Sequence, residues 1–394
     1  MKNQLVICVT CLLCSLSSLA QNKLQDSIAR LPLSQQIDAY KILIKQHLRS
    51  DLDKALQWIE QGMQAAKKQQ NQKAVGFFLL NKGVVYESKG KSVQALEYYT
   101  QALDIALATR EPISAAKAYQ NMGIAHAKQG KYQQCVEFFF KALRIYEQLE
   151  DTEHMIGMYN NLAILHMRMA NYAQALEVYQ KGLSLSRKTN NQQMIARIQA
   201  NISQLYLRNK DHNRAIEALR ESLKISQEEK DYMQVVATVG NIAEVYQDKK
   251  QLDSALQLNQ EAIRLHRKYK LEDGMVLRYV SMAQIYNDLS KPDSSTYFYE
   301  KALQQIPKNT ITPTLLNVYG SMHLQYAQHQ KYKQAYSYLL KHNSVKDSLF
   351  TLKKNKQIEE LKAKYELDTK QQLQGTLAVL QRDKGASFEI TFTA

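Results

Sequence analysis

Small and aromatic residues recur along this chain with a fixed spacing of forty residues. In the stretch from Ala118 to Ala142, a small residue at Gly123 is followed by a ring at His126, a small residue at Cys135 and a ring at Phe139. Between these positions the apolar residues return at helical intervals, and Gly, Asn, Asp or Pro interrupt the pattern at regular points. The pattern predicts pairs of helices joined by short turns, and no strands.

The spacing holds without an insertion from Leu43 to His342. The first small position of each copy reads, in chain order, Leu43, Gly83, Gly123, Ala163, Ser203, Ala243, Ala283 and His323. Six copies match well and the outer two are less regular, which is typical of a solenoid whose terminal repeats act as caps. We therefore expect each pair to cover the apolar face of its neighbour, with small residues where helices pack closely.

These small, aromatic and alanine positions resemble the tetratricopeptide repeat, in a variant with longer helices that is similar to the repeat of kinesin light chain. The resemblance covers residues 34–348. It implies an all-α fold, a right-handed superhelix of about eight helix pairs whose first helices line a concave groove. It also implies a protein that binds a peptide or another protein and is not an enzyme.

Both ends of the chain differ from the repeats. Lys2 precedes an apolar run that is too short to cross a bilayer and ends in Ser18-Leu19-Ala20. This is the pattern of a signal peptide cleaved after Ala20, which predicts export to the periplasm or cell envelope; a retained membrane anchor is the alternative. The remaining segments are a polar lead-in at 21–33, a long charged helix at 349–383 and a tail at 384–394.

Residues 352–383 carry two short apolar stripes that are interrupted by Asp368 and Gly375. We expect this helix to pair two copies of the chain as a broken coiled coil, or to cap the last repeat. A homodimer is therefore one of the predicted assemblies.

Charge and composition narrow the range of partners. The formal net charge is +15, but the basic residues are spread over all repeats and form no run with interleaved aromatic residues. This distribution argues against nucleic acid and favours acidic partners, or a position near an anionic membrane surface. After cleavage only Cys135 remains, so we expect no disulfide and a buried Cys135.

No motif for chemistry stands out. The sequence has no glycine-rich phosphate loop, zinc-binding pattern or nucleophile elbow. His126 and His166 occupy equivalent ring positions in neighbouring repeats, and we expect them to be packing residues rather than ligands. The sequence thus predicts no catalytic residue, no metal and no cofactor.

Asparagine recurs at one position of the first helix in five successive repeats, as Asn81, Asn121, Asn161, Asn201 and Asn241. Asparagine is unfavourable inside a helix because its amide competes for backbone groups, so five in register need a reason. The functional interpretation is a ladder of amides that binds the backbone of a peptide. The structural alternative is hydrogen bonding between neighbouring helices that sets the angle between repeats. Both stay open.

A second polar row lies seven residues further on, about two helical turns, and shares this face. It contains Lys128, Arg168 and Arg208, followed by Asp248 and Asp288. We expect it to give the groove a basic floor that attracts an acidic segment of the partner; the alternative is that these charges are solvated near helix ends. The residues that we place near the same face are Gln120, Asn160 and Arg197.

A second resemblance concerns the organisation of the chain. An exported repeat array followed by a helix of the type K-x-x-x-I-x-E-L-x-x-K-Y-E is similar to the sensor half of two-component histidine kinases of Bacteroidetes-type bacteria. In those proteins a membrane helix and a kinase or output domain follow, and neither is expected after Leu352. Residues 384–392 resemble the last glycine turn and strand of the kinase ATP-binding domain, and a disordered tail is the alternative. The second hypothesis is therefore a sensor portion whose membrane helix and kinase domain are missing.

Overall fold

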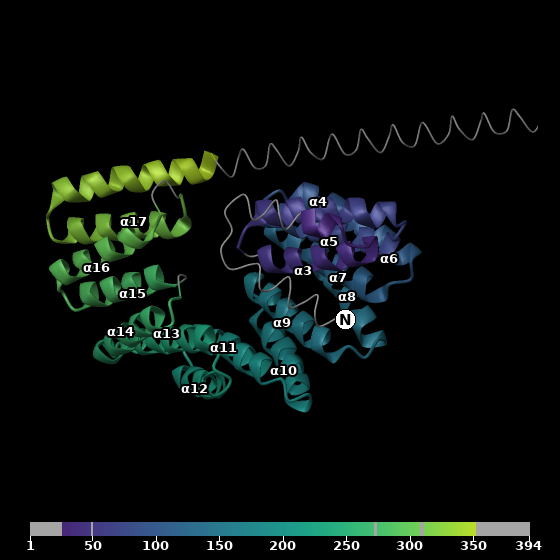
Figure 1. Cartoon of the computed structure of the whole chain (residues 1–394). Coiled ribbons are helices and arrows are strands. Elements are labelled where there is room, and N and C mark those ends of the chain that lie inside the picture. The colour runs from purple at the N-terminus through teal and green to yellow at the C-terminus, as the bar shows by residue number, and fades with distance from the viewer. Residues whose placement is uncertain (1–25, 49, 272–273, 308–310, 352–394) are drawn as a thin grey trace, which may run out of the picture. The chain divides into compact units, whose positions relative to one another are not determined.

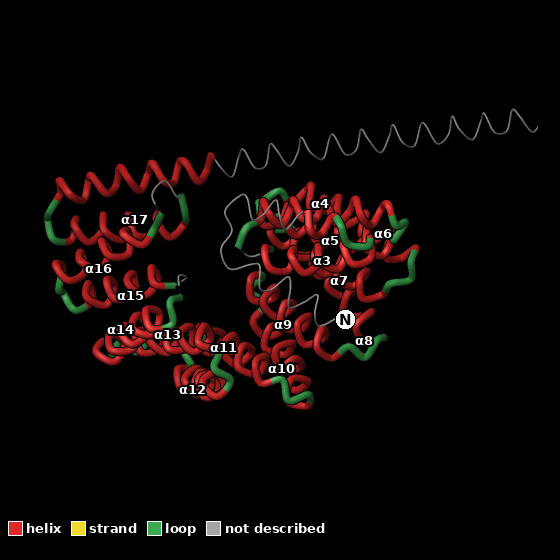
Figure 2. The backbone as a smooth tube through the Cα atoms, in the orientation of Figure 1, coloured by secondary structure: helices red, strands yellow, loops and turns green. Residues whose placement is uncertain are grey.

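The computed structural model describes residues 26–48, 50–271, 274–307 and 311–351. Within these ranges the chain is helical and contains no strand, and Figure 2 shows helices joined by short turns throughout. The predicted all-α fold is confirmed. The predicted signal peptide, the charged segment from Leu352 onward and the tail lie outside the described residues.

The helices follow one another at regular intervals along the chain (Figure 1). They are α3 (Leu33–His47), α4 (Leu52–Lys68), α5 (Gln72–Ser88), α6 (Ser92–Ala108), α7 (Pro112–Lys128), α8 (Tyr132–Gln148), α9 (Thr152–Arg168), α10 (Tyr172–Lys188), α11 (Gln192–Arg208), α12 (His212–Glu228), α13 (Tyr232–Asp248), α14 (Leu252–Lys268), α15 (Met275–Asp288), α16 (Pro292–Gln305) and α17 (Pro313–Gln328).

A further helix covers residues 332–351, up to the end of the last described range. It packs against α17, where the ring centroids of Tyr326 and Tyr338 are 5.5 Å apart, so the described chain holds the eight helix pairs that the sequence predicts. This helix runs without a break through residues 348–349, where the repeats were predicted to end. The last repeat therefore continues directly into the segment predicted as a charged helix.

The chain divides into two compact units, and the division falls inside α9, after Met158. Each unit is a stack of helix pairs in which consecutive helices pack against each other, as α5 does with α6 and α11 does with α12. First helices of neighbouring repeats also touch, as α5 does with α7 and α11 with α13. The first helices α5 and α7 of the first unit, and α11, α13 and α15 of the second, therefore lie side by side.

The period of the chain is fixed by its turns. Helices α4 to α14 each contain 17 residues, and each is followed by a residue in the left-handed region. Gly90 and Gly130 take this conformation with φ of +77° and +76°. The next amide then donates to the carbonyl five residues back, as Lys131 N does to His126 O at 2.9 Å, and this closes the helix end. One helix and one turn thus take twenty residues, and a pair takes forty.

Most of these left-handed positions are not glycine. With φ between 51° and 60°, they are Gln70, Arg110, Glu150, Ala170, Asn190, Lys210, Lys230, Lys250, Lys270, Ser290 and Gln330. An L-residue in this region is strained by its Cβ, so the surrounding helix ends hold the conformation against the local preference. Because only some of these turns contain glycine, the sequence alone identifies some of the left-handed positions and not others.

The small positions lie where the two helices of a pair meet. A Cβ added at Gly123 would approach the Phe139 ring to 2.5 Å, so the ring occupies the space that glycine leaves. The second small position is fully buried in repeat after repeat, at Ala95, Cys135, Ala175, Ala215, Ala255 and Ser295. The expectation that small residues mark close helix packing, and that Cys135 is buried, is confirmed.

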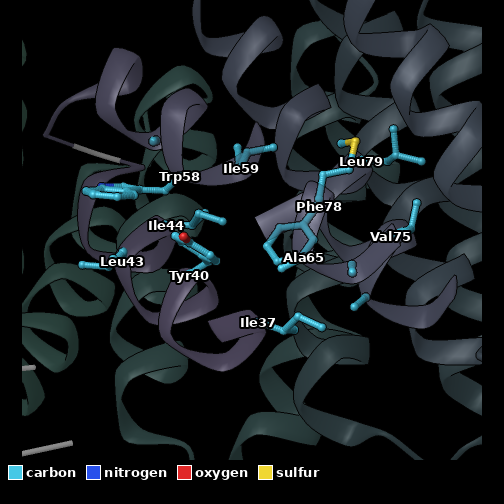
Figure 3. Packing of buried hydrophobic residues seen from close by; sticks show 14 of the residues in the cluster. Ile37, Tyr40, Leu43, Ile44, Trp58, Ile59, Ala65, Val75, Phe78 and Leu79 are labelled. Carbon is cyan, nitrogen blue, oxygen red and sulfur yellow. The ribbon is translucent and has the colours of Figure 1, made fainter. Parts of the chain in front are cut away.

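The first core cluster closes the N-terminal end of the described chain. Figure 3 shows Trp58 of α4 with Tyr40, Leu43 and Ile44 of α3, and the Trp58 and Tyr40 ring centroids are 6.1 Å apart. Ile28 of the lead-in is buried in the same cluster. The described part of the lead-in therefore belongs to the packed core of the first unit. No helix in the described ranges is long and apolar enough to cross a membrane.

Candidate functional site on the first helices

The five asparagines of the predicted ladder are all half-exposed, and two of them are engaged within the protein. Asn81 donates to Phe77 O of its own helix at 2.8 Å. Asn201 on α11 donates to Asn160 Oδ1 on α9 at 2.9 Å, which links the first helices of two neighbouring repeats. Asn201 therefore has the contact that the structural interpretation requires.

The remaining members are Asn121, Asn161 and Asn241. In the described part of the chain their side chains make no hydrogen bond, although each is half-exposed on a first helix. An Asn amide has two donor hydrogens and an acceptor oxygen, which matches the acceptor and donor of a peptide backbone. These three positions keep their hydrogen-bonding capacity for solvent or a ligand.

Two cations of the second polar row contact residues of the preceding repeat. Lys128 Nζ lies 3.0 Å from Glu87 Oε1, and this buried carboxylate also accepts from Ser92 Oγ at 3.2 Å. The Arg208 guanidinium lies 5.6 Å from the centroid of the Tyr172 ring. Both contacts join one repeat to the preceding one, so these charges stabilise the stack as well as facing solvent.

Arg168 differs from its two counterparts. It is exposed at the end of α9, and no carboxylate of the described residues lies within 4 Å of it. Arg197, on α11, is also exposed, and its nearest polar contact is Met194 Sδ at 3.9 Å. Both cations belong to the second unit, four or seven residues from an asparagine of the ladder.

The acidic members of the row are paired with the repeat before them. Asp248 accepts from Lys210 at 2.7 Å and lies 2.6 Å from His212 Nε2, and Asp288 is 3.3 Å from Lys250. The hydrogen bonds from Lys210 and His212 hold the pKa of Asp248 below its usual range. The lysines precede their partners by 38 residues, a spacing visible in the sequence that the row alone did not reveal.

The other two predicted residues point to internal partners. Gln120 Oε1 accepts from Tyr146 OH on α8 at 3.5 Å, and Asn160 is buried at its contact with Asn201. Both thus take part in contacts between helices.

A buried polar network that the sequence interpretation missed lies where the asparagine row ends. Arg278 on α15 is 5 % exposed, and its guanidinium reaches Glu244 at 3.3 Å and Asn259 at 3.5 Å. A side chain at Gly240 would collide with this guanidinium. Ser281, which follows Asn241 in the row, is buried and donates to Gln247 at 3.0 Å. The open part of the row therefore ends at Asn241.

The sequence does indicate this network when equivalent positions of the repeats are compared. The position of Arg278 is occupied in six other repeats by Phe78, Ala118, Met158, Ile198, Thr238 and Val318, and in the first repeat by the exposed Asp38. A charge at a position that is uncharged and buried in those six repeats needs partners, because an unpaired buried charge is very costly. The glycine at position 240 makes room for this charge.

The histidine at the ring position of α7 is used for packing. His126 lies on Phe138, with ring centroids 5.3 Å apart and planes inclined by 5°, and burial lowers the pKa of His126. Among the described residues, no three His, Cys, Asp or Glu side chains are grouped so that they could hold a metal ion.

Family models of the tetratricopeptide repeat match residues 79–113, 116–149, 154–228 and 235–269. This chain is a tetratricopeptide repeat protein. The matches cover α6 to α14 and most of α5, and α3, α4 and α15 to α17 have the same paired arrangement on either side. Arrays of this repeat are typically scaffolds for binding other proteins rather than enzymes. Comparison with curated proteins by sequence gives no match.

Solved structures with the same fold agree with this assignment. The apo quorum sensor NprR from B. thuringiensis is 15% identical, with a TM-score of 0.59 over 83% of this chain and 92% of its own. A STAND signal transduction ATPase with a tetratricopeptide repeat sensor, from Pyrococcus horikoshii, is 14% identical, with a TM-score of 0.60 over 90% of this chain and 55% of its own. The apo form of RapI is 15% identical, with a TM-score of 0.57 over 70% of this chain and 99% of its own. At these low sequence identities, the comparison shows only that the tetratricopeptide repeat protein and these structures share a fold.

Proposed function

We propose that this tetratricopeptide repeat protein is an exported, non-catalytic interaction module that binds an extended segment of a peptide or protein along its first helices. The observation that carries the proposal is the pair of half-exposed amides at Asn161 and Asn241 in the second unit, which share one register and have no partner within the described chain. Helices that pack side by side lie about 10 Å apart. An extended peptide covers about 10 Å in three residues. Asn161 and Asn241 are two repeats apart, so together they suit residues about six positions apart in a bound strand.

Charge favours an acidic residue in the bound segment. Arg168 and Arg197 are exposed near Asn161 and Asn201 in the second unit, and neither is neutralised by a carboxylate of the described residues. Lys128 and Arg208 are held by Glu87 and by a tyrosine ring, so they contribute less. We expect the acidic residue of the ligand to lie beside α9 and α11.

A peptide selection on the mature chain tests the proposal. Random peptides displayed on phage are enriched on the protein, and the best is measured by titration calorimetry against Asn161→Ala/Asn241→Ala. Each lost hydrogen bond is worth about 1 kcal/mol, so the double variant should bind roughly thirtyfold more weakly. The matched control is Asn213→Ala, which removes an exposed asparagine from the second helix α12 and should leave affinity unchanged.

Charge reversal provides the second arm of this experiment. Arg168→Glu should weaken binding of an acidic peptide, whereas Lys224→Glu, an equal change on an exposed face of α12, should not. Arg168 is preferred to Lys128 because a change at Lys128 also breaks the ion pair with Glu87. Selection of no peptide, or equal affinity for all variants, would refute the groove.

Export rests on the pattern of residues 1–20. Expression of the full sequence in a Gram-negative host should yield a periplasmic or envelope-bound chain whose first residue is Gln21, which N-terminal sequencing detects. A chain that keeps Met1 in the soluble cytoplasmic fraction would contradict this part of the proposal.

A second candidate is the sensor portion of a two-component histidine kinase or a related regulator. Two solved structures of the same fold belong to sensors by description, NprR as a quorum sensor and the Pyrococcus horikoshii ATPase through its repeat sensor. The same groove would then take the signal, and another chain would supply the output. Sequencing of the DNA beyond the codon for Ala394 tests this, since a membrane helix and kinase in any reading frame would favour the sensor.

A further inference from the structure

A surface pocket of about 390 Å³ opens between α14, α15 and α16 in the second unit. It is separate from the asparagine row: Tyr279, which lines it, precedes Ser281 of the row by two residues, or about 200° around α15. Its volume is in the range of small-molecule sites. The residues that line it are Gln260, Ile263, Arg264, Arg267, Tyr279, Met282, Tyr297, Phe298 and Lys301.

The pocket combines cations with aromatic rings. Arg267 Nη2 donates to Tyr279 OH at 3.1 Å, and Lys301 Nζ lies 5.5 Å from the centroid of the Tyr297 ring. No carboxylate of the described residues lies within 4 Å of Arg267 or Lys301. Arg264 differs, because Glu261 binds it through two hydrogen bonds of 2.8 Å. Two cations at this site are therefore available to an external anion.

Comparison with the other repeats shows how this charge arises. The position of Tyr297 is glutamate in four earlier repeats, at Glu97, Glu137, Glu177 and Glu217. In one of these, Glu177 pairs with Lys181 at 2.8 Å, and Lys181 is the counterpart of Lys301. At Tyr297 the intramolecular partner of the lysine has been replaced by a ring, which is 52 % exposed. Along the repeats, only this one has tyrosine at that position followed by lysine four residues later.

We propose that the pocket binds a carboxylate attached to an aromatic group. The carboxylate lies between the Arg267 guanidinium and the Lys301 ammonium, where charge-assisted hydrogen bonds are strongest. The aromatic part stacks on the exposed Tyr297 ring, against the wall of the pocket that the buried Ile263 and Met282 form. Such a ligand is either a free aryl acid or the C-terminus of a peptide that ends in an aromatic residue.

Three probes test whether binding needs the carboxylate charge and whether the ligand is a free acid or a peptide end. They are 3-phenylpropanoate as a free acid, N-acetylphenylalanine as a peptide end, and N-acetylphenylalaninamide, which keeps the ring and loses the charge. Binding to the mature full chain is measured by titration calorimetry at low salt. Both acids should bind at least about tenfold more tightly than the amide, the minimum expected for one hydrogen bond to a charged group. Whichever acid binds more tightly identifies the source.

Tyr297→Glu is the decisive variant. It restores the residue found in four other repeats, so folding should be preserved, and it supplies the carboxylate that Glu177 gives to Lys181. Affinity for the acids should fall at least about tenfold, and Arg267→Gln should have a similar effect. The control is Gln133→Glu on α8, which adds the same charge at an exposed site of the first unit. Equal affinity for acid and amide, or full affinity in Tyr297→Glu, would overturn the proposal.

Discussion

The left-handed turns allow one substitution, glycine to alanine, to be tested with opposite expected signs. Gly130 ends α7 with φ of +76°, and a Cβ added there would meet no atom within 4 Å. Gly157 lies inside α9, and a Cβ there would also meet nothing within 4 Å. Steric contact is thus absent at both sites, and only the backbone conformation distinguishes them.

The magnitudes follow from that difference. An L-residue in the left-handed region costs about 1–2 kcal/mol. Part of this is offset because glycine loses roughly 0.5–1 kcal/mol more backbone entropy than alanine on folding. Gly130→Ala should therefore destabilise the first unit by about 1 kcal/mol. In the helix, Gly157→Ala should stabilise the same unit by about 1 kcal/mol, through helix propensity alone. Ala170→Gly, at φ of +59°, is the reverse of the first change and should stabilise the second unit.

Urea unfolding followed by circular dichroism gives the global effect. A repeat array can unfold in steps, so hydrogen exchange supplies a local measurement. The amide of Lys131 donates to His126 O across the turn at 2.9 Å, and its exchange should be about fivefold faster in Gly130→Ala. A stabilising effect of Gly130→Ala, or the same sign at Gly130 and Gly157, would show that the turn conformation is not the reason for the period.

Three further experiments test the polar interior and the links between repeats. Burial lowers the pKa of His126 below 6.5, so the folded state resists the proton and stability should fall as pH drops through that value. His126→Phe should remove this slope, which urea midpoints at pH 7.5 and 5.5 measure. Lys210 holds the pKa of Asp248 below 3.8, so the Asp248→Asn variant should be less stable than the parent at pH 7. The two proteins should become equally stable once acid has protonated Asp248 in the folded state. A constant difference in stability across the titration would contradict this. Glu244→Gln should leave the Arg278 guanidinium buried without its carboxylate and cost about 3 kcal/mol, more than Arg278→Met, which removes the charge itself.

The periodic part of the fold could be predicted because each repeat has the same pattern of small and aromatic residues. Gly123 and Ala175 mark close helix contacts, and Phe139 marks the ring that fills the space between helices, so their spacing alone gives the number of pairs and their register. The turns are also local, since a helix end needs only a left-handed residue and the bond that closes it. No long-range information was needed for either.

The candidate site was harder to predict because its chemistry depends on which side chains meet across repeats. The sequence placed Asp248 and Asp288 in the row of Lys128, but it did not show that each acid is paired with a lysine of the repeat before it. Nor did it separate Asn201, which bonds to Asn160, from Asn161, which has no such partner. These differences depend on the rotation of neighbouring helices, which a single row of equivalent positions does not contain.

Departures from the repeat were the more useful signal. Arg278 and Tyr297 each break the pattern of their own column, and each marks a place where the structure does something different from the other repeats. A search for such exceptions, column by column, would have found both from the sequence. The prediction of groove residues relied instead on similarity between repeats, and residues that are similar in every repeat are mainly those that the packing of the scaffold requires.

The equal length of the turns from α4 to α14 has a consequence for how such a gene can change. Excision of residues 211–250 would join Lys210 to Gln251 in the same conformation that Lys250 has now, since both residues have nearly the same φ, 60° and 59°. Lys210 would then precede Asp288 by 38 residues, the separation it now has from Asp248. Loss of this unit would thus restore both the bend and the ion pair, but Arg278 would lose Glu244 and would meet the Cβ of Ala200 in place of Gly240. Recombination between repeats can therefore vary the length of the array most easily among repeats that lack this buried network.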